Sequence, residues 1–146
     1  MKNVLVILLV TAGFLGSCAQ QVAQGNVPSI VLNTFLTSYP KATDVEWKLK
    51  GSVYRVEFEI GKTDHEAWYD GSGKLLKHKE EIKIAELPAA VSNTVKKDFP
   101  GYTPDDADKI EEDGKVFYVI ELDGVQNDRI LHVTPEGKVL ENKIDY

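Results

Sequence analysis

The chain has 146 residues, a length that suits one domain or two small halves that share a core. Its 42% hydrophobic and 27% charged residues exclude a disordered or fibrous protein. The formal net charge is −6 and no stripe of Lys or Arg offsets it, which excludes nucleic acid as a partner because the chain repels phosphate backbones.

Residues 1–17 predict a signal peptide. Lys2 supplies a positive charge, an apolar run follows at 4–10, and small residues come next. The apolar run is too short to span a membrane. We therefore expect this segment to be removed during export, and it takes no part in the predicted fold.

The only cysteine of the chain, Cys18, follows this segment. Leu15-Gly16-Ser17-Cys18 resembles a bacterial lipobox, which implies that Cys18 carries a lipid and that the protein is a membrane-anchored lipoprotein of the periplasm. Ordinary cleavage after Ala19 is the alternative, with Ser17 and Ala19 as the small residues that the peptidase recognises. Residues 18–26 are then the lipidated cysteine and a polar tether that reaches roughly 20 Å when extended. A single cysteine leaves no internal disulfide.

Two segments predict short helices. The segment 27–40 has a proline near its start, apolar residues at 27, 31 and 35 on one stripe, and Pro40 at its end. The segment 87–100 has the same plan, with apolar residues at 91, 95 and 99. The two segments are offset by 60 residues, from 27 to 87, and Asn-Thr recurs at the same offset.

Alternating apolar and polar residues, separated by turn signals, predict four strands after each helix. The first set lies at 45–49, 53–60, 65–70 and from 74 onward, and the second at 109–112, 116–122, 129–134 and from 138 onward. The strand 54–59 matches 118–123 in order and type, at an offset of 64 residues. The additional residues of the second set fall in 102–108, which we interpret as a loop.

The constant offset of the later strands predicts a tandem repeat with units at 27–86 and 87–146. Each unit alone has a one-sided sheet whose apolar face needs covering. We therefore predict an α+β fold in which eight antiparallel strands form one curved sheet, with two helices on its apolar face. The last strand, 139–146, is predicted at an edge, where charged residues disfavour pairing with a second copy and favour a monomer.

These features together resemble a known family. A signal peptide with a lipobox, two helix-plus-strands units, and the motifs Tyr-x-Val/Ile-Glu-Phe/Leu and Gly-Lys-x-Leu look like those of the PepSY-like periplasmic proteins, whose fold is similar to that of beta-lactamase inhibitor protein. The resemblance covers residues 27–146. It implies a binding or inhibitory role in the cell envelope, with one sheet face holding a partner, and it supplies no catalytic residues.

The alternation also assigns strand residues to the two faces of the sheet. The face toward the helices receives Tyr54, Val56, Phe58, Ala67, Tyr69, Tyr118, Ile120, Leu122, Leu131 and Val133. The opposite face receives Glu46, Lys48, Arg55, Glu57, Glu66, Trp68, Phe117, Val119, Glu121, Ile130 and His132. Because aromatic residues and arginine anchor protein interfaces, we single out Arg55, Trp68, Phe117 and His132 as partner-binding residues. The alternative is that strands favour such residues anyway and that a loop or the tether covers them.

No motif predicts a catalytic residue, a cofactor or a metal site. His65, His78 and His132 lack the spacing of a zinc site, and we expect ordinary surface histidines. Six carboxylates at 105–113 lack the spacing of a calcium loop, because Ile110 stands where a ligand is needed, so a solvated acidic loop is favoured. No Gly-x-Ser-x-Gly motif, phosphate loop or dinucleotide fingerprint occurs in the sequence.

The sequence therefore predicts an exported, non-enzymatic module that binds a protein or peptide in the cell envelope, with inhibition as one form that binding can take. It predicts contact with the membrane through the lipid anchor only. One alternative is a periplasmic carrier of a small molecule or a metal, and another is a small hydrolase without a recognisable motif.

Overall fold

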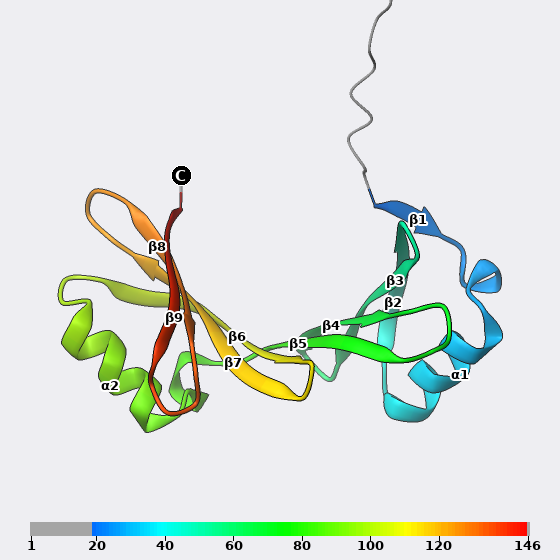
Figure 1. The fold of residues 1–146 in the computed structure, drawn as a ribbon, viewed down its shortest axis with the longest axis horizontal. Helices are drawn as coiled ribbons and strands as arrows, with labels where there is room; N and C mark the ends of the chain where they lie inside the picture. Colours follow the sequence, from blue (N-terminus) through cyan, green and yellow to red (C-terminus); the bar gives the residue numbers. More distant parts are fainter. Residues whose placement is uncertain (1–18, 146) are drawn as a thin grey trace, which may run out of the picture.

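A computed structural model describes residues 19–145 of the chain (Figure 1). The predicted signal peptide and Cys18 lie outside this part. The helices are α1 (Ser29–Ser38) and α2 (Ala89–Asp98), with short 3-10 helices η1 (Gln24–Asn26) and η2 (Ile84–Glu86). The strands are β1 (Gln20–Val22), β2 (Thr43–Lys50), β3 (Val53–Ile60), β4 (Thr63–Tyr69), β5 (Leu75–Glu81), β6 (Thr103–Glu112), β7 (Lys115–Asp123), β8 (Asp128–Val133) and β9 (Val139–Asp145).

The described strands form one nine-stranded sheet, ordered as they occur along the chain, in which each strand pairs antiparallel with the next. The α+β fold with a single curved sheet and two helices on one face is confirmed (Figure 1). The prediction of eight strands is wrong by one, because β1 occupies part of the predicted tether. Val22 of β1 pairs with Trp47 and packs against the core, and this apolar contact holds the segment in the sheet.

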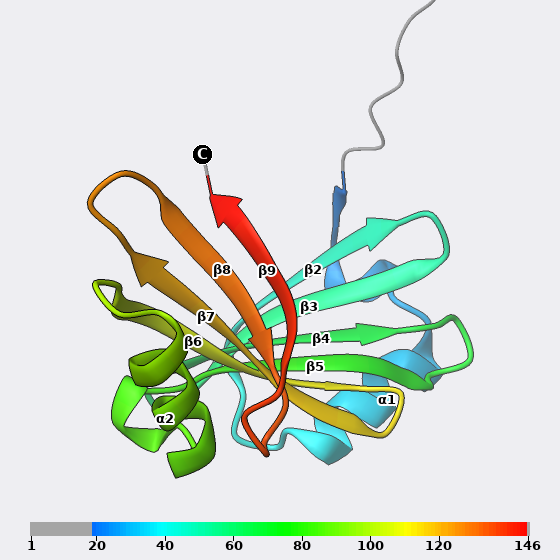
Figure 2. The ribbon, with the colours of Figure 1, turned by 60° about the vertical axis from the view of Figure 1, so that its left-hand side comes forward.

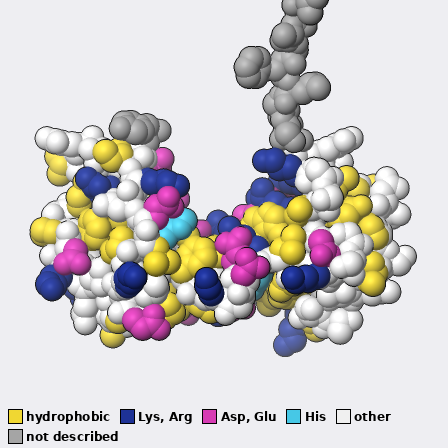
Figure 3. Space-filling view, in the orientation of Figure 1, with side chains coloured by type: hydrophobic (Ala, Val, Ile, Leu, Met, Phe, Trp, Pro, Cys, Tyr) yellow, Lys and Arg dark blue, Asp and Glu magenta, His cyan; other side chains and the backbone are white. Residues whose placement is uncertain are grey.

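The sheet bends so that α1 and α2 lie on its convex side and the opposite face is hollowed between two halves (Figures 1 and 2). We call β1–β5 with α1 the first half, β6–β9 with α2 the second half, and the side away from the helices the concave face. Figure 3 shows this hollow between two bulky lobes. No helix within residues 19–145 is long and apolar enough to cross a membrane.

The helices α1 and α2 confirm the two predicted helical segments. Each follows a proline, Pro28 or Pro88, and each ends shortly before another proline, which cannot continue a helix. Along 29–38 and 89–98 the order of exposed, half-buried and buried residues is identical. Each helix therefore presents the same narrow stripe to the sheet.

Each half has its own core. The first contains Val27, Val31, Phe35, Trp47, Val56, Phe58, Ala67 and Tyr69, and the second contains Leu87, Val91, Val95, Ala107, Ile120, Leu122, Leu131 and Val133. Phe35 of α1 meets Trp47 and Phe58 edge-on, with ring centroids 5.3 and 5.0 Å apart. The residues predicted to face the helices are all buried in one core or packed against it, so the inward assignment is confirmed.

The stretch interpreted as a loop, 102–108, is strand except for its first residue, since β6 begins at Thr103. Ala107 is 1% exposed and pairs with Ile120 under α2, so one small residue supplies the inward face. The carboxylates around it hid this alternation in the sequence. The additional residues of the second set do not lie here. Asp108 pairs with Val119 as Lys48 pairs with Arg55, so the additional residues lie beyond Asp108 and lengthen the β6–β7 hairpin.

Two equivalent glycines let each helix approach the turn before the last strand of its half. Gly73 and Gly137 have φ of +85° and +87°, a region that favours glycine. A Cβ at Gly73 would lie 3.1 Å from the carbonyl oxygen of Ile30, and one at Gly137 would lie 2.7 Å from that of Ala90. The close packing of helix on turn therefore explains the glycine of the Gly-Lys-x-Leu motif.

Candidate protein-binding face

The four residues predicted to bind a partner lie on strands of the concave face as two pairs. Arg55 on β3 stands opposite Trp68 on β4. The ring of Phe117 on β7 stacks on the imidazole of His132 on β8, with centroids 5.5 Å apart and planes 19° from parallel. Each pair belongs to one half, and β5 and β6 separate the two pairs.

Positive side chains surround Trp68. The guanidinium carbon of Arg55 lies 5.5 Å from the centre of the indole ring, and Nζ of Lys77 lies 5.1 Å from it. Such contacts are favourable because the ring face is negative. A hollow of about 460 Å³, which we call the Trp68 hollow, is lined by Ala19, Lys48, Lys50, Val53, Arg55 and Trp68.

A row of alternating charges crosses the concave face from β2 to β6. Its ion pairs are Lys48–Glu57 at 2.8 Å, Arg55–Glu57 at 2.6 Å, Arg55–Glu66 at 2.6 Å, Lys79–Glu66 at 3.8 Å and Lys79–Asp108 at 2.9 Å. The side chains are between 14% and 33% exposed, so neighbours hold them without removing them from water. The row fixes the positions of charged groups across five strands and spans both halves.

The protonation of this row follows from its contacts. The hydrogen bond from Lys48 lowers the pKa of Glu57, and Arg55 adds to the effect. Burial opposes a charge on Lys79, but the hydrogen bond to Asp108 and nearby carboxylates outweigh burial and raise the pKa of Lys79. Burial raises the pKa of Asp108, and Lys79 offsets this only in part. Of the two carboxylates, Glu57 in the first half is therefore held in its charged form by its contacts, whereas burial disfavours the charge of Asp108 in the second half.

Apolar side chains form a patch on the concave face of the second half. Ile110 stands opposite Phe117 and is 3% exposed, although it belongs to neither core. Val119 and Ile130 lie on neighbouring strands and are half-buried. Nδ1 of His132 lies 3.6 Å from the carboxylate of Glu141, close enough for an ion pair when the imidazole is protonated. The second half therefore has an apolar patch that the row of charges in the first half lacks.

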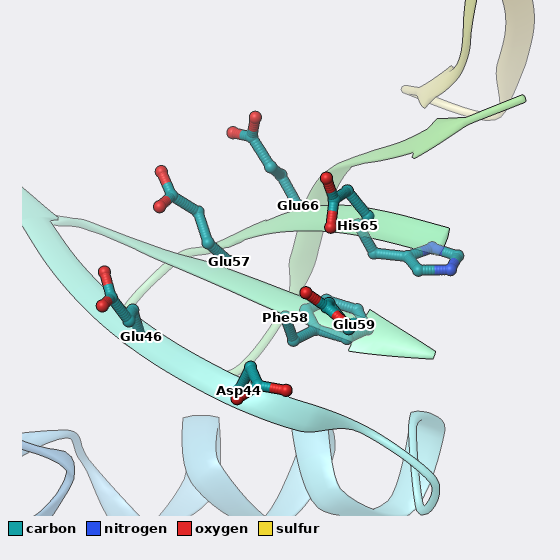
Figure 4. A pocket seen from close by; sticks show the side chains of 8 residues that line it. Asp44, Glu46, Glu57, Phe58, Glu59, His65 and Glu66 are labelled. Atoms are coloured by element: carbon teal, nitrogen blue, oxygen red, sulfur yellow. The ribbon is translucent and has the colours of Figure 1, made fainter. Parts of the chain in front are cut away.

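A second hollow, of about 380 Å³, lies at the other end of β2, β3 and β4 (Figure 4). Its lining residues are Asp44, Glu46, Glu57, Phe58, Glu59, Asp64, His65 and Glu66. Glu46, Glu57 and Glu66 point away from α1, toward the concave side (Figure 4). The sequence alone does not indicate this acidic hollow, because its carboxylates are spread over three strands and only the strand register brings them together.

The expectation of ordinary surface histidines is wrong for His65. This residue is 7% exposed, and its Nδ1 lies 3.2 Å from Nε2 of His78 on the side of the sheet that faces α1. The rings of Phe58 and Tyr39 pack beside the two imidazoles. Burial lowers the pKa of both histidines. Strand alternation could have indicated this position, since residue 65 has the same parity as Ala67 and Tyr69.

The expectation of a solvated acidic loop is also wrong, because most of its carboxylates lie on β6. Asp106 and Asp108 stand opposite Glu121 and Val119 on the concave face. Burial, with repulsion from Asp106, raises the pKa of Glu121. Within residues 19–145, no three His, Cys, Asp or Glu side chains are grouped as metal ligands.

Comparison with known protein families identifies one match. The model of the family described as "Putative beta-lactamase-inhibitor-like, PepSY-like" matches residues 17–77 and again residues 52–141. Together the two matches cover most of the chain, including both helices and all strands from β1 to the start of β9. No curated protein matches the sequence.

Solved structures share the fold. A BLIP-like protein from Bacteroides fragilis is 22% identical, covers 79% of this chain with 84% of its own, and superposes with a TM-score of 0.69. A DUF2874 family protein from Bacteroides uniformis is 20% identical over 80% of this chain and 88% of its own, with a TM-score of 0.73. A protein from Bacteroides eggerthii, described as periplasmic, is 20% identical over 81% and 88%, with a TM-score of 0.73. At these identities the likeness establishes the fold alone.

Proposed function

Since this chain belongs to the family of beta-lactamase-inhibitor-like, PepSY-like proteins, we propose that it is an exported, non-enzymatic module that binds a protein or peptide in the cell envelope. The observation that carries the proposal is the concave face. Arg55–Trp68 lies on its first half, Phe117–His132 lies on its second half, and a row of fixed charges that includes Arg55 spans both halves. Half-buried aromatic residues and arginine on an open, curved sheet are typical of interface anchors. Inhibition follows if the bound partner is an enzyme.

We place the protein in the periplasm, held to a membrane by a lipid on Cys18. The lipobox-like sequence before Cys18 and the periplasmic description of the similar Bacteroides eggerthii protein support this location. Replacing Cys18 by Ala in cells tests the anchor, because a protein without lipid moves from the membrane fraction to the soluble fraction. A Cys18→Ala protein that stays in the membrane fraction would contradict lipidation.

Affinity capture tests the proposed face. Residues 19–146 serve as bait for envelope extract of the parent cell, beside a triple variant carrying Arg55→Ala, Trp68→Ala and Phe117→Ala. We expect the wild-type bait to retain a partner that the triple variant loses by at least tenfold, because each change removes an interface anchor. Circular dichroism of the variant shows whether its fold is intact.

A matched control places the same number of truncations outside the concave face. Leu36 and Val125 are 48% and 99% exposed, and Lys97 lies on the exposed side of α2. The control with Leu36→Ala, Lys97→Ala and Val125→Ala is expected to hold the partner as wild type does. Equal capture by both variants would remove the concave face from the proposal.

One observation favours the carrier hypothesis as a second candidate. An apolar hollow of about 290 Å³ lies between η2, α2 and the start of β6, lined by Ile84, Ala85, Leu87, Ser92, Val95, Lys96, Tyr102 and Pro104. A small apolar molecule fits a space of this size and lining. Native mass spectrometry of the protein purified from its own cells decides between the candidates. A carrier retains the mass of a bound small molecule, and Val95→Phe, which fills the hollow, should abolish that added mass.

A further inference from the structure

The first half of the concave face gathers positive charge in a chain whose net charge is −6. Lys48, Lys50 and Arg55 line the Trp68 hollow, and Lys77 lies against the Trp68 ring. The ion pairs bring only Glu57 and Glu66 to these four cations, which leaves the group with two positive charges in excess. Lys and Arg side chains gather there beside the start of β1 (Figure 3).

Two of these lysines are free of ion pairs. Among the described residues, neither Lys50 nor Lys77 contacts a carboxylate within salt-bridge distance, whereas Lys48 and Arg55 each do. Lys50 is exposed and Lys77 is half-buried against the indole. The hollow and its rim therefore combine an aromatic ring with two ammonium groups that form no ion pair, although Lys77 stands opposite Glu112 in the sheet. Such a combination suits an anionic and partly apolar surface.

The chain enters the fold at this hollow. Ala19 is one of its lining residues, and β1 then pairs with β2 through Gln20 opposite Leu49 and Gln21 opposite Lys48. Because β1 belongs to the sheet, the predicted tether does not separate the domain from Cys18. One peptide bond joins Ala19 to Cys18, so a lipid on Cys18 brings the membrane surface to the rim of the hollow.

We propose that the Trp68 hollow docks on the anionic phospholipid surface of the membrane, with the indole at headgroup level and Lys50 and Lys77 against lipid phosphates. Tryptophan favours the interface between hydrocarbon and water, and lysines near an anionic bilayer are attracted to it. A lipid chain together with a basic patch is an effective two-part membrane attachment. This contact adds to the lipid anchor, which the sequence predicted as the only one.

The docked orientation turns the first half of the concave face toward the bilayer. Docking leaves Phe117 and His132 of the second half open to a partner, whereas a partner that also contacts Arg55 and Trp68 competes with the membrane for these two side chains. The proposal stands apart from the identity of that partner, because it concerns only the hollow and the lipid.

The test uses Cys18 as a handle, since it is the only thiol of the chain. Residues 18–146 are coupled through Cys18 to a maleimide lipid in phosphatidylcholine vesicles prepared with or without phosphatidylglycerol. Lipids carrying a nitroxide at the headgroup quench tryptophan fluorescence near the bilayer. Trp47 is 2% exposed in the core, so Trp68 supplies the signal, and Trp68→Phe gives the background.

We expect quenching several-fold stronger in vesicles with phosphatidylglycerol than in those without it, and weaker at high salt because the attraction is screened. Lys50→Glu with Lys77→Glu should reduce quenching to the level without phosphatidylglycerol. Lys41→Glu with Lys97→Glu makes the same charge change at exposed positions just after α1 and on α2, away from the hollow, and should leave quenching unchanged.

Equal quenching in both lipid mixtures would mean that coupling alone brings Trp68 near the bilayer, and it would overturn the proposal. Equal loss in the two charge-reversal variants, or no quenching at all, would overturn it as well. Unchanged urea unfolding midpoints of both variants establish that folding is not the cause. Affinity capture works without vesicles, so its failure and the failure of docking are separate results.

Discussion

The first and second halves of the molecule build the same frame around different cores. Their helices bury the same positions in the same order, yet Phe35 and Trp47 in the first half correspond to Val95 and Ala107 in the second. The rings fill the first core, whereas the smaller side chains of the second leave the hollow of about 290 Å³ beside α2. The two halves thus share their backbone arrangement because they bury equivalent positions, and the volume of the side chains at those positions determines how tightly each core is packed.

The concave face differs between the halves more than the cores do. Arg55 and Trp68 of the first half correspond, at an offset of 64 residues, to Val119 and His132 of the second. Lys48, paired with Arg55, corresponds to Asp108, paired with Val119. One half therefore offers cations around a ring and the other an apolar patch with acidic neighbours, so each half is suited to a different contact.

The largest expected effect tests the two cores. Phe35→Ala should lower the free energy of unfolding by about 3–5 kcal/mol, since a fully buried ring that packs on three others is lost. Val95→Ala should lower it by about 2 kcal/mol, because fewer buried methyl groups are removed beside an existing hollow. Urea unfolding measures both, and equal losses would contradict the difference in packing.

The next largest effect is expected at the two equivalent glycines, Gly73 in the first half and Gly137 in the second. Gly73→Ala and Gly137→Ala should each cost about 1–2 kcal/mol, because alanine at positive φ is strained. Gly137→Ala should cost more, since its Cβ would meet Ala90 more closely and its carbonyl accepts a 2.7 Å hydrogen bond from Thr94. The same unfolding measurement compares them, and a larger loss at Gly73 would show that the helices do not pack as described.

The stability of the first half should depend on pH in a way that the second half does not share. Burial lowers the pKa of His65 and His78 in the folded protein below the ordinary value of 6.5. As the pH falls through about 6.5, the unfolded chain therefore takes up protons first. The stability that the neutral pair contributes is complete above this range and is lost on acidification. Urea midpoints measured between pH values of about 7.5 and 5.5 should fall accordingly.

The second half supplies the control for this pH effect. The positions equivalent to His65 and His78 are Arg129 and Asn142, where Nη1 of Arg129 donates a 2.9 Å hydrogen bond to Oδ1 of Asn142. This pair does not titrate in the same range. A protein with His65→Arg and His78→Asn should therefore lose most of the fall in the midpoint, and an unchanged fall would assign it to other groups.

The smallest expected effect concerns the charged row. Arg55→Ala breaks two ion pairs at a side chain that is 33% exposed, so it should change the free energy of unfolding by no more than about 1 kcal/mol. Lys143→Ala in the second half, at 62% exposure, should have no measurable effect. A loss of several kcal/mol for Arg55→Ala would mean that the row supports the fold and is not reserved for binding.

Much of the fold could be predicted because its signals are local. The spacing of Val31 and Phe35, the prolines around each helix, and the alternation along β3 and β7 all act within a few residues. Asp113-Gly114 is a typical hairpin sequence, and both residues have positive φ in the turn between β6 and β7. The tandem repeat and its boundaries remain a prediction from these same signals.

The missed features depend on partners that are distant in the sequence. The segment 20–22 is short and mostly polar, so it carries no strand signal of its own. It becomes a strand because it pairs with the edge of β2. Ala107 carries too little apolar surface to mark β6 in a run of carboxylates, but α2 covers it. In the sequence His65 looks like an exposed polar residue, but in the fold Phe58 and His78 enclose it.

By itself the sequence determined the two helices, most of the inward residues of β3, β4, β7 and β8, and the one-sheet α+β fold, because these follow from periods of two and of three to four residues. Only the tertiary structure decided which side chains meet across the sheet. The charged row, the acidic hollow and the Trp68 hollow beside Ala19 all combine residues from several strands. Strand register and the bend of the sheet bring them together, and neither is encoded within a single segment of the chain.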